Sequence, residues 1–521
     1  MKKKISLLLC ASMTALLLAG CSGKTSREPE SEPPESVIAS SPAEESSPED
    51  TGGIDFSENP YEVRMIITLP AASPSQNEID RVIEKVNEIT LKKLNMTLKL
   101  ELVPYSTYLE QIPLELSSGS NIDLLTAITG YAQSWVSTGY LVDMADLLEE
   151  YGQGTLDSYA SRDLALAANL NGFVFGVPVH KEVAQQATIF FRTDILDKYD
   201  IDVSGVKTLA DVDKIYEEVA QKEPGMWMLA ADNLGAGKTV VCDLSVGGTS
   251  MAALMDFEND TTVTNMLESD EFKEWCDYNH KWFQKGWINS GAASDTESYY
   301  SYISSGQAFS FFSDYGHPLS EADQENNCGG VDLTMVTMGE PYATTSTAAI
   351  FSYAISSGSK DPVKAMKMLN LIETDTEIMN LLNWGVEGED YIVNEDGLLD
   401  YPEGKDASSV GYHLGAGWIL PNQFVCTPWV TDGADVYDKV IEYNKTARIS
   451  KALGFTFDPE PVADEIAATS NVRNKYYKAL IVGAVDPDEY LPKMNEELKA
   501  AGMDTIIAES QKQLDAYLAA R

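Results

Sequence analysis

The chain has 521 residues, of which 44 % are hydrophobic, and a formal net charge of −44 at pH 7. This length and apolar fraction suit two or three domains with ordinary globular cores. The strong negative charge argues against nucleic acid as a partner and against docking on anionic lipid, because both interactions reward basic patches.

The N-terminus reads as an export signal that ends in a cysteine. Lysines at 2–4 precede an apolar run over 5–18, which is shorter than the roughly 20 apolar residues that span a bilayer. The tetrapeptide Leu-Ala-Gly-Cys at 18–21 resembles the lipobox of bacterial lipoproteins. The resemblance implies loss of residues 1–20, lipidation of Cys21 and a place on the extracytoplasmic face of the cell membrane. An ordinary secretory signal with a chance cysteine is the alternative.

Residues 21–56 are expected to form a disordered acidic linker. Prolines alternate with serine and glutamate, and this low hydrophobicity leaves little to pack into a core. As a flexible coil the segment would reach on the order of 30 Å, which suits a tether between the membrane and a globular body.

The globular body opens with alternating strands and helices. Apolar runs at 63–69 and 122–128 and an alternating pattern at 98–102 predict three strands. A capping box over Ser75-Gln76-Asn77-Glu78 predicts the start of the first helix, and 108–116 should form the second. This β-α-β-α-β order indicates a parallel sheet, whose ligand-binding loops lie at the carboxyl ends of the strands.

A second α/β pattern follows a turn and strand at 171–179. Strands are predicted at 188–192, 227–231 and 308–312. The helix over 272–283 carries its aromatic residues on one face, and we expect that face to be core rather than a ligand contact.

Several motifs resemble the family 1 extracellular solute-binding proteins, the maltose-binding-like receptors of ABC importers. They are Ile122-Asp123-Leu124-Leu125 followed by Gly139-Tyr140-Leu141-Val142-Asp143, the segment Asn171–Pro178, and Glu297–Phe312. The C-terminal motifs Asn383–Gly388, Leu453–Asp458 and Gly483–Pro487 are similar to the lipoprotein subgroup that carries a C-terminal domain of unknown function.

The resemblance implies an α/β fold of the periplasmic-binding-protein-like type II class, with two α/β lobes joined by hinge strands around a central cleft. It assigns 57–175 to lobe 1, 176–340 to lobe 2, 341–385 to a return into lobe 1, and 386–521 to a C-terminal helical region that completes the lobes and cleft.

The sequence contains no clear enzyme signature. Gly237-Lys238-Thr239 mimics the end of a phosphate-binding loop, but Asp232 stands where its first glycine is required. The sequence has no G-x-S-x-G and no H-E-x-x-H. A glycosidase pair could still hide among the many acidic residues. We expect no catalytic residues, no metal and no cofactor. Disulfide pairing is left open for Cys242, Cys276, Cys328 and Cys426.

Candidate ligand-binding residues come from strand ends and from alignment with the family. A sugar site needs flat aromatic faces together with amides or carboxylates for the hydroxyl groups. Each candidate could instead be a core or surface residue, and for Trp384 and Glu387 we favour a structural role. We expect Trp429 to stack on a sugar ring opposite Tyr131. The candidates are Tyr105, Thr129 and Tyr131 in lobe 1, His180 and Glu182 after the hinge, Asp232, Asp314 and Tyr315 in lobe 2, and Asn422, Gln423 and Trp429 in the family-like C-terminal segment.

These observations predict a monomeric, lipid-anchored receptor that captures an oligosaccharide and passes it to an ABC permease. Capture would occur by lobe closure about hinge strands near 176–179. The alternatives are a cell-surface glycoside hydrolase, or the same fold binding a peptide or another polar solute.

Overall fold

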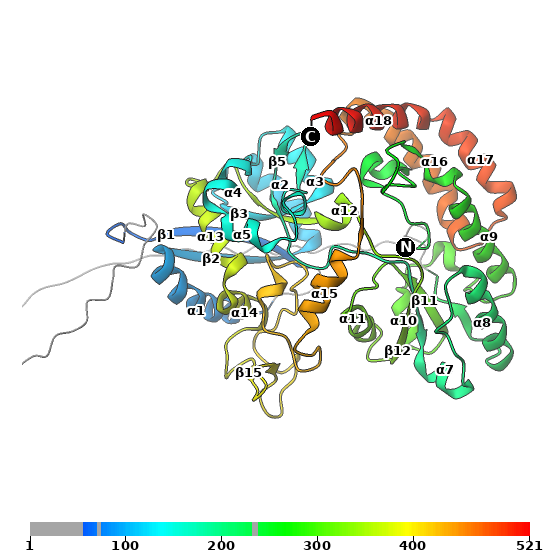
Figure 1. The fold of residues 1–521 in the computed structure, drawn as a ribbon, viewed down its shortest axis with the longest axis horizontal. Helices are drawn as coiled ribbons and strands as arrows, with labels where there is room; N and C mark the ends of the chain where they lie inside the picture. Colours follow the sequence, from blue (N-terminus) through cyan, green and yellow to red (C-terminus); the bar gives the residue numbers. More distant parts are fainter. Residues whose placement is uncertain (1–55, 70–73, 232–237, 521) are drawn as a thin grey trace, which may run out of the picture. The chain divides into compact units, whose positions relative to one another are not determined.

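Two separate β-sheets organise the computed structural model, which describes residues 56–69, 74–231 and 238–520 (Figure 1). The predicted signal peptide, Cys21 and nearly all of the predicted linker lie outside the described residues, and so does Asp232. We call the part built on the first sheet lobe 1 and the part built on the second sheet lobe 2.

The sheet of lobe 1 has the strand order β2-β1-β3-β14-β6. β1 (Tyr61–Leu69) runs parallel to β2 (Met96–Pro104) and to β3 (Leu124–Ile128), as the sequence predicts. β14 (Phe351–Ile355) is antiparallel to both β3 and β6 (Val177–Pro178). The ends of β1, β2, β3 and β6 and the start of β14 therefore lie at one edge of the sheet.

The first helix, α1 (Gln76–Leu94), forms as predicted, but the predicted capping box does not. Ser75 is the N-cap residue, yet its side chain makes no capping hydrogen bond. The Glu78 carboxylate instead accepts from Arg81 Nε at 2.9 Å, one helical turn further on. α1 packs through an apolar stripe against lobe 1, together with α2 (Tyr105–Ser117), α13 (Pro362–Thr374) and α14 (Thr376–Trp384).

The sheet of lobe 2 has the order β12-β7-β11-β8. β11 (Ala308–Ser313) is antiparallel to β7 (Thr188–Arg192) and parallel to β8 (Trp227–Leu229), and β7 also pairs with β12 (Leu333–Thr337). The predicted aromatic face belongs to α9 (Asp270–Gln284). Its residues Phe272, Trp275 and Trp282 are buried in the core, which confirms that part of the prediction.

The C-terminal helices pack on lobe 2. α16 (Ala463–Ile481) and α17 (Pro487–Ala500) contact α9, and α18 (Met503–Ala520) contacts both of them, as the orange and red helices of Figure 1 show. Their apolar side chains share one core with those of α9. The region after 386 is thus divided: its first part packs on lobe 1 and its last helices pack on lobe 2.

Shorter elements connect the two sheets and their covering helices. The helices are α3 (Thr129–Ser137), α4 (Ala145–Tyr151), α5 (Gln153–Ser158), α6 (Arg162–Ala165), α7 (Thr193–Tyr199), α8 (Leu209–Lys222), α10 (Tyr299–Ser304), α11 (Ser320–Asn327), α12 (Thr345–Ala348) and α15 (Val436–Lys445). The strands are β4 (Asn169–Leu170), β5 (Phe173–Val174), β9 (Ala252–Ala253), β10 (Thr264–Asn265), β13 (Tyr342–Ala343), β15 (Ile392–Val393), β16 (Leu399–Asp400) and β17 (Arg448–Ile449).

Three segments of the chain cross between the lobes. The first, 179–187, joins β6 to β7; the second, 338–350, joins β12 to β14; the third, 446–452, follows α15. Gln185 pairs with Tyr342 of the second segment, and Tyr342 in turn pairs with Arg448 of the third. The crossing segments therefore form a small hydrogen-bonded ribbon, the place where a hinge is expected in this fold.

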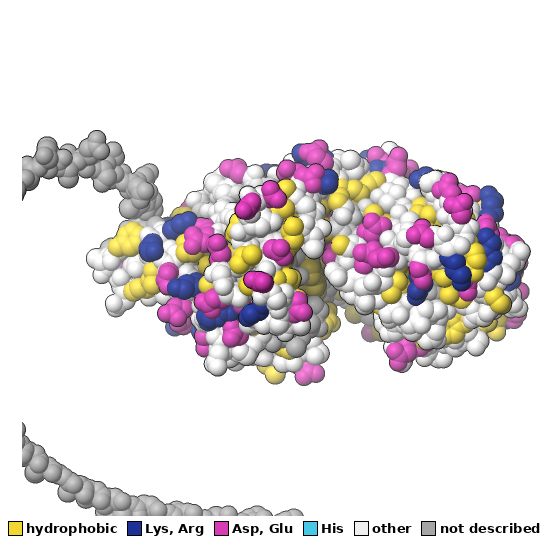
Figure 2. Space-filling view, turned by 90° about the horizontal axis from the view of Figure 1, so that it is seen from below, with side chains coloured by type: hydrophobic (Ala, Val, Ile, Leu, Met, Phe, Trp, Pro, Cys, Tyr) yellow, Lys and Arg dark blue, Asp and Glu magenta, His cyan; other side chains and the backbone are white. Residues whose placement is uncertain are grey.

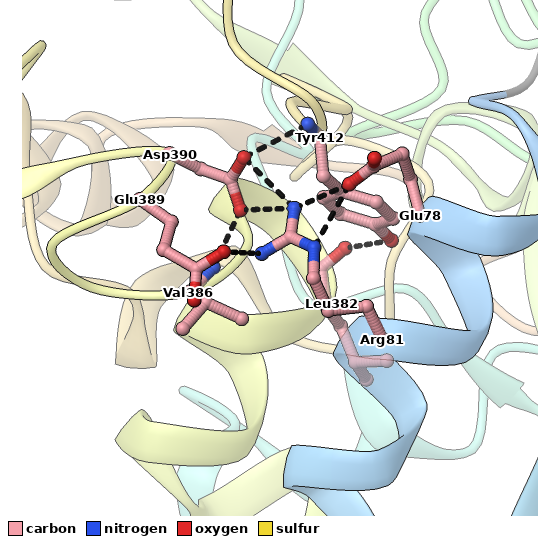
Figure 3. A network of polar contacts seen from close by, with 7 residues as sticks. All are labelled: Glu78, Arg81, Leu382, Val386, Glu389, Asp390 and Tyr412. Carbon is pink, nitrogen blue, oxygen red and sulfur yellow. Dashed lines mark hydrogen bonds and ion pairs between the residues drawn. The ribbon is translucent and has the colours of Figure 1, made fainter.

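One arginine fixes the segment after α14 to lobe 1 (Figure 3). Arg81 Nη2 donates to both oxygens of the buried Asp390 carboxylate, at 3.0 and 2.8 Å. The same carboxylate accepts from the backbone N–H groups of Val386 and Tyr412. Gly385 has a φ of +98°, and a side chain there would collide with Asp390. This packing supports the structural role predicted for the Trp384–Gly388 motif.

The four cysteines among the described residues are free thiols: Cys242, Cys276, Cys328 and Cys426. Over the same residues, no group of histidine, cysteine or acidic side chains could hold a metal ion. Nor does any helix in the described ranges combine the length and apolarity needed to cross a membrane.

Candidate functional site

Glu182 lies on the first crossing segment, in the floor between the lobes. Its carboxylate accepts hydrogen bonds from Lys181 Nζ at 2.7 Å and from Gln423 Nε2 at 2.9 Å. Burial opposes ionisation, but the charge and the hydrogen bond of Lys181 hold the pKa of Glu182 below its usual range. The Glu182 carboxylate is therefore ionised at neutral pH and paired with the Lys181 ammonium.

His317 faces this carboxylate from the loop that follows β11. Its side chain is 4 % exposed, and its Nδ1 has no hydrogen-bond partner among the described residues. Burial lowers the pKa of His317, although Glu182 acts in the opposite direction. A neutral imidazole with one free ring nitrogen is suited to a hydroxyl group, which can both donate and accept.

Asp314 and Tyr315 form the edge of lobe 2 beside the floor. The Asp314 backbone carbonyl accepts from Gln186 N at 2.9 Å, and its carboxylate lies 3.3 Å from Lys238 Nζ. Tyr315 is 40 % exposed. Desolvation, and next the charge of Asp314, raise the pKa of Tyr315 to about 12, so its phenol stays neutral and presents an aromatic face with a hydroxyl.

Tyr105 and Tyr131 form the matching edge of lobe 1. They lie in the first turns of the helices that follow β2 and β3, and they are 39 % and 42 % exposed. Burial raises the pKa of Tyr105, and the phenol of Tyr131 raises it further. The two phenols are therefore neighbours. Thr129 is placed differently, because its hydroxyl donates to the Ala349 carbonyl and ties the start of α3 to the second crossing segment.

The family-like segment at 421–424 pairs with the first crossing segment. His180 N donates to Pro421 O at 2.8 Å, and Gln423 N donates to His180 O at 3.1 Å. Asn422 is buried and donates to the Glu373 carbonyl at 2.8 Å. Asn422 thus positions the segment, whereas Gln423 reaches the floor through Glu182.

His180 packs between two aromatic rings. It stacks on Tyr159 with ring centroids 4.3 Å apart, and it makes a T-shaped contact with Phe424 whose ring centroid lies 4.9 Å from its own. Burial lowers the pKa of His180 to about 4, so the ring is neutral, and its Nδ1 has no partner in the described part of the chain. The ring lines a cavity of about 240 Å³ that also includes Lys181 and Asn444.

Trp429 lies in an aromatic cluster rather than on an open wall. It is 6 % exposed and packs against Tyr401, Trp384 and His413 at centroid distances of 4.5, 5.4 and 5.3 Å. In this arrangement so little of the indole is accessible that it packs as core, whereas the sequence analysis expects it to stack on a sugar ring.

Trp418 is better placed and was missed by the sequence reasoning. It is partly exposed, and its ring lies 5.8 Å from Phe351, at the start of β14 on the ligand-side edge of the lobe 1 sheet. Its neighbour Gly417 abuts Gln423. The feature of the sequence that could have identified Trp418 is its position just before the family-like segment.

Lys181, Gln186 and His317 were also missed, although each lies within four residues of a predicted site residue.

The structure places five of the predicted residues in two groups, Tyr105 with Tyr131 on lobe 1, and Glu182 with Gln423 and Tyr315 at the floor and lobe 2. Figure 2 shows a hollow in the surface between the lobes. Exposed tyrosines stand on both sides, and the floor supplies a carboxylate, an amide and a neutral imidazole. Such a surface can hold a flat polar molecule by ring contacts and hydrogen bonds. The five are Tyr105, Tyr131, Glu182, Tyr315 and Gln423, with Asp314 at the border.

Comparisons with known proteins agree with this architecture. Residues 451–519 match a domain of unknown function, DUF3502. A carbohydrate ABC transporter substrate-binding protein of Streptococcus pneumoniae serotype 4 is 27 % identical over 478 residues, which are 87 % of this chain and 91 % of the relative.

Solved structures share the two-lobed type II fold. The N-glycan transport solute-binding protein of Streptococcus pneumoniae superposes with a TM-score of 0.77 at 24 % identity, covering 88 % of this chain and 99 % of that one. A solute-binding protein from Bifidobacterium longum infantis, described as HMO-binding and ABC-transporter-associated, gives 0.60 at 15 % identity, with 88 % and 99 % covered. Residues 83–383, more than half of the chain, match the model for bacterial extracellular solute-binding proteins, and the chain belongs to that family.

Proposed function

We propose that this protein is the substrate-binding component of an ABC importer and captures a carbohydrate between its two lobes. The observation that carries the proposal is the pair of exposed tyrosine edges, Tyr105 and Tyr131 on lobe 1 and Tyr315 on lobe 2, on either side of a hydrogen-bonding floor. Aromatic faces suit the C–H patches of sugar rings, and the floor suits their hydroxyl groups.

The relatives support the same ligand class. The Streptococcus pneumoniae N-glycan transport protein was solved in complex with Man1GlcNAc and with Man5GlcNAc. The 27 % identical relative is named a carbohydrate ABC transporter substrate-binding protein. By this proposal the protein binds its ligand as a monomer, changes no covalent bond in it, and delivers it to the permease subunits of the transporter.

Lobe closure about the three crossing segments is the proposed mechanism. The segments hold one another by backbone pairing through Gln185, Tyr342 and Arg448. Rotation about such a ribbon moves the tyrosine edges toward each other without unfolding either sheet. The proposed lobe boundaries follow the sequence scheme of 57–175 and 341–385 in lobe 1 and 176–340 in lobe 2, except that the first boundary moves to 178, because β6 pairs with β14 in the sheet of lobe 1.

Binding without turnover is tested by a thermal-shift screen. Man1GlcNAc and Man5GlcNAc are screened with neutral fructans, and each hit is chromatographed after long incubation. At a hundredfold excess over Kd, binding adds about 2.7 kcal/mol of stability, which should raise Tm by a few degrees. Unchanged glycan supports the proposal, whereas shortened products would establish a glycoside hydrolase instead.

Tyr131→Ala tests the site itself. It should weaken binding at least about tenfold, since a buried aromatic contact contributes 2 kcal/mol or more. Leu114→Ala, which removes an exposed side chain on α2, is the matched control and should bind as wild type does. Equal affinity of both variants would remove the lobe 1 edge from the site.

The lipid anchor is a separate part of the proposal. Cys21→Ser should release the protein from the membrane fraction or block its processing, because the thioether forms on that sulfur. Retention of the variant in membranes at the wild-type level would contradict the anchor and leave the binding proposal intact.

A further inference from the structure

A short segment of the chain packs its side chains into both lobes. It follows the third crossing segment, and we call residues 453–458 the strap. Leu453 is buried in the apolar core of lobe 1 that also contains Ile66 of β1. Phe455 and Phe457 are buried instead in the core that α9 shares with the C-terminal helices. The strap therefore belongs to both lobes at once.

The strap is tied to lobe 1 by a side chain from the ligand edge. Gln133 Nε2 on α3 donates to the Phe457 carbonyl at 2.8 Å. α3 is the helix whose first turn carries Tyr131. Thr345 of the second crossing segment holds the other end of the strap, because its hydroxyl accepts from Gly454 N at 2.9 Å. Lobe 1 and the crossing ribbon thus each bind the strap by hydrogen bonds.

The last helix of the chain binds the same strap. Tyr517 Oη on α18 donates to the Leu453 carbonyl at 2.7 Å. Gln513, one turn earlier, donates to the Asp458 carbonyl at 3.0 Å and accepts from the Asp458 N–H at 2.9 Å. Gly454 has a φ of +85°, and a β-carbon there would lie 2.5 Å from the Tyr517 hydroxyl, so this close approach requires glycine. Side chains of α18 therefore fix both ends of the strap.

We propose that the C-terminal domain at 451–519 restricts the rotation of the two lobes, and that the strap is the part that does so. Backbone pairing within the narrow crossing ribbon leaves the lobes free to bend and to twist. A tie from α3 through the strap to α18 removes part of that freedom, so that the lobe 1 and lobe 2 tyrosine edges approach along one path.

The restriction has a consequence for ligand affinity. A ligand that closes lobes whose motion is already confined loses less free energy in ordering them. This effect on affinity rests on the proposed carbohydrate-binding function, whereas the restriction of rotation does not.

Distances between nitroxide labels on the two lobes, measured by double electron–electron resonance without ligand, test the restriction. The labels are attached at exposed positions of α1 and α9 through Glu84→Cys and Glu274→Cys. Cys242→Ala removes a partly exposed native thiol from this background. Gln133→Met keeps the length of the side chain and loses the donor, so it should broaden the distribution of distances between the lobes.

A second variant removes the tie on the other side. Tyr517→Phe loses the hydroxyl that binds Leu453 and keeps the ring that packs on Phe455 at a centroid distance of 5.6 Å. It should broaden the distribution as well. Gln133→Lys keeps a donor and should restore the narrow distribution. Melting curves establish that each variant folds.

The matched control lies inside lobe 1. Gln153 Nε2 on α5 donates to the Glu149 carbonyl at 2.7 Å, a hydrogen bond of the same kind that does not involve the strap. Gln153→Met should leave the distribution as in wild type. A broadening as large as that of Gln133→Met would overturn the assignment to the strap.

Glycan affinity is the second readout. Gln133→Met should weaken binding about threefold to tenfold, the change in affinity that one hydrogen bond of ordinary strength produces. Distributions as narrow as wild type in both Gln133→Met and Tyr517→Phe would overturn the restriction. Broadened distributions with wild-type affinity would overturn its link to binding. Broadened distributions in a protein that binds no glycan would uphold the strap and overturn the proposed function alone.

Discussion

A buried carboxyl group gives the sharpest prediction about stability. Glu373, on α13 of lobe 1, is 0 % exposed, and neither carboxyl oxygen has a hydrogen-bond partner in the described residues. Burial raises the pKa of Glu373 well above the usual 4.5. The folded protein therefore keeps a proton that the unfolded chain releases above pH 4.5.

Because the folded protein must hold this proton and the unfolded chain releases it, the free energy of unfolding decreases as the pH rises. Because the folded-state pKa is raised, the stability is greatest below the unfolded pKa and falls with pH until the folded carboxyl ionises. The slope is about 1.4 kcal/mol per pH unit. Glu373→Met removes the linkage and keeps a side chain of similar length, so its stability relative to wild type should rise with pH above 4.5 for as long as the folded carboxyl stays protonated.

Urea unfolding followed by tryptophan fluorescence, repeated from pH 4.5 to 7.5, measures this difference. The pH slope of wild type should be steeper than that of Glu373→Met. Glu84→Gln, a change at an exposed glutamate on α1, is the control and should follow wild type at every pH. A stability difference between wild type and Glu373→Met that does not change with pH would refute the proton linkage.

Three further predictions concern the aromatic cluster, the Arg81 network and the thiols. Trp429→Ala should cost about 3–5 kcal/mol of unfolding free energy and leave glycan affinity unchanged in the folded fraction, whereas Trp418→Ala should weaken binding about tenfold at little cost in stability. Asp390→Ala should cost about 3–5 kcal/mol in urea unfolding, because it removes the buried acceptor of two backbone N–H groups and one of the carboxylate partners of Arg81. Cys426 should react with a thiol reagent only on unfolding, because burial raises the pKa of its thiol to about 12.

Each of these predictions has a contrary outcome. Weakened binding with unchanged stability in Trp429→Ala would return that residue to the ligand site. Wild-type stability of Asp390→Ala would show that the Arg81 contacts contribute nothing net, as happens for many exposed ion pairs. Rapid labelling of Cys426 in the native state would mean that its surroundings open readily.

The strands and most helices could be predicted because their sequences carry a regular period. The apolar run at 63–69 and the alternation at 98–102 correspond to β1 and β2. The aromatic face of α9 is buried as its spacing indicates. The capping box at Ser75 failed for a tertiary reason, since Arg81 takes the Glu78 carboxylate into a network that includes Asp390, 309 residues away in the chain.

The site could be predicted only where it follows strand ends. Tyr105, Tyr131 and Tyr315 each follow a strand, and the rule for parallel sheets places such residues at the ligand edge. Trp418 and Trp429 lie in irregular backbone after α14, where no period shows which indole turns outward. Their placement depends on contacts such as that of Gly417 with Gln423.

The cleft floor is held by backbone contacts that do not need a ligand. The Asn444 side chain of α15 accepts from Val183 N and Ala184 N at 3.0 and 3.2 Å and donates to Lys181 O at 3.1 Å. Gln423 pairs with His180 through its backbone while its side chain bonds Glu182. The residues on either side of Glu182 are thus fixed in advance. Because ordering a site costs free energy on binding, a floor built this way leaves more of the ligand's interaction energy for moving the lobes together.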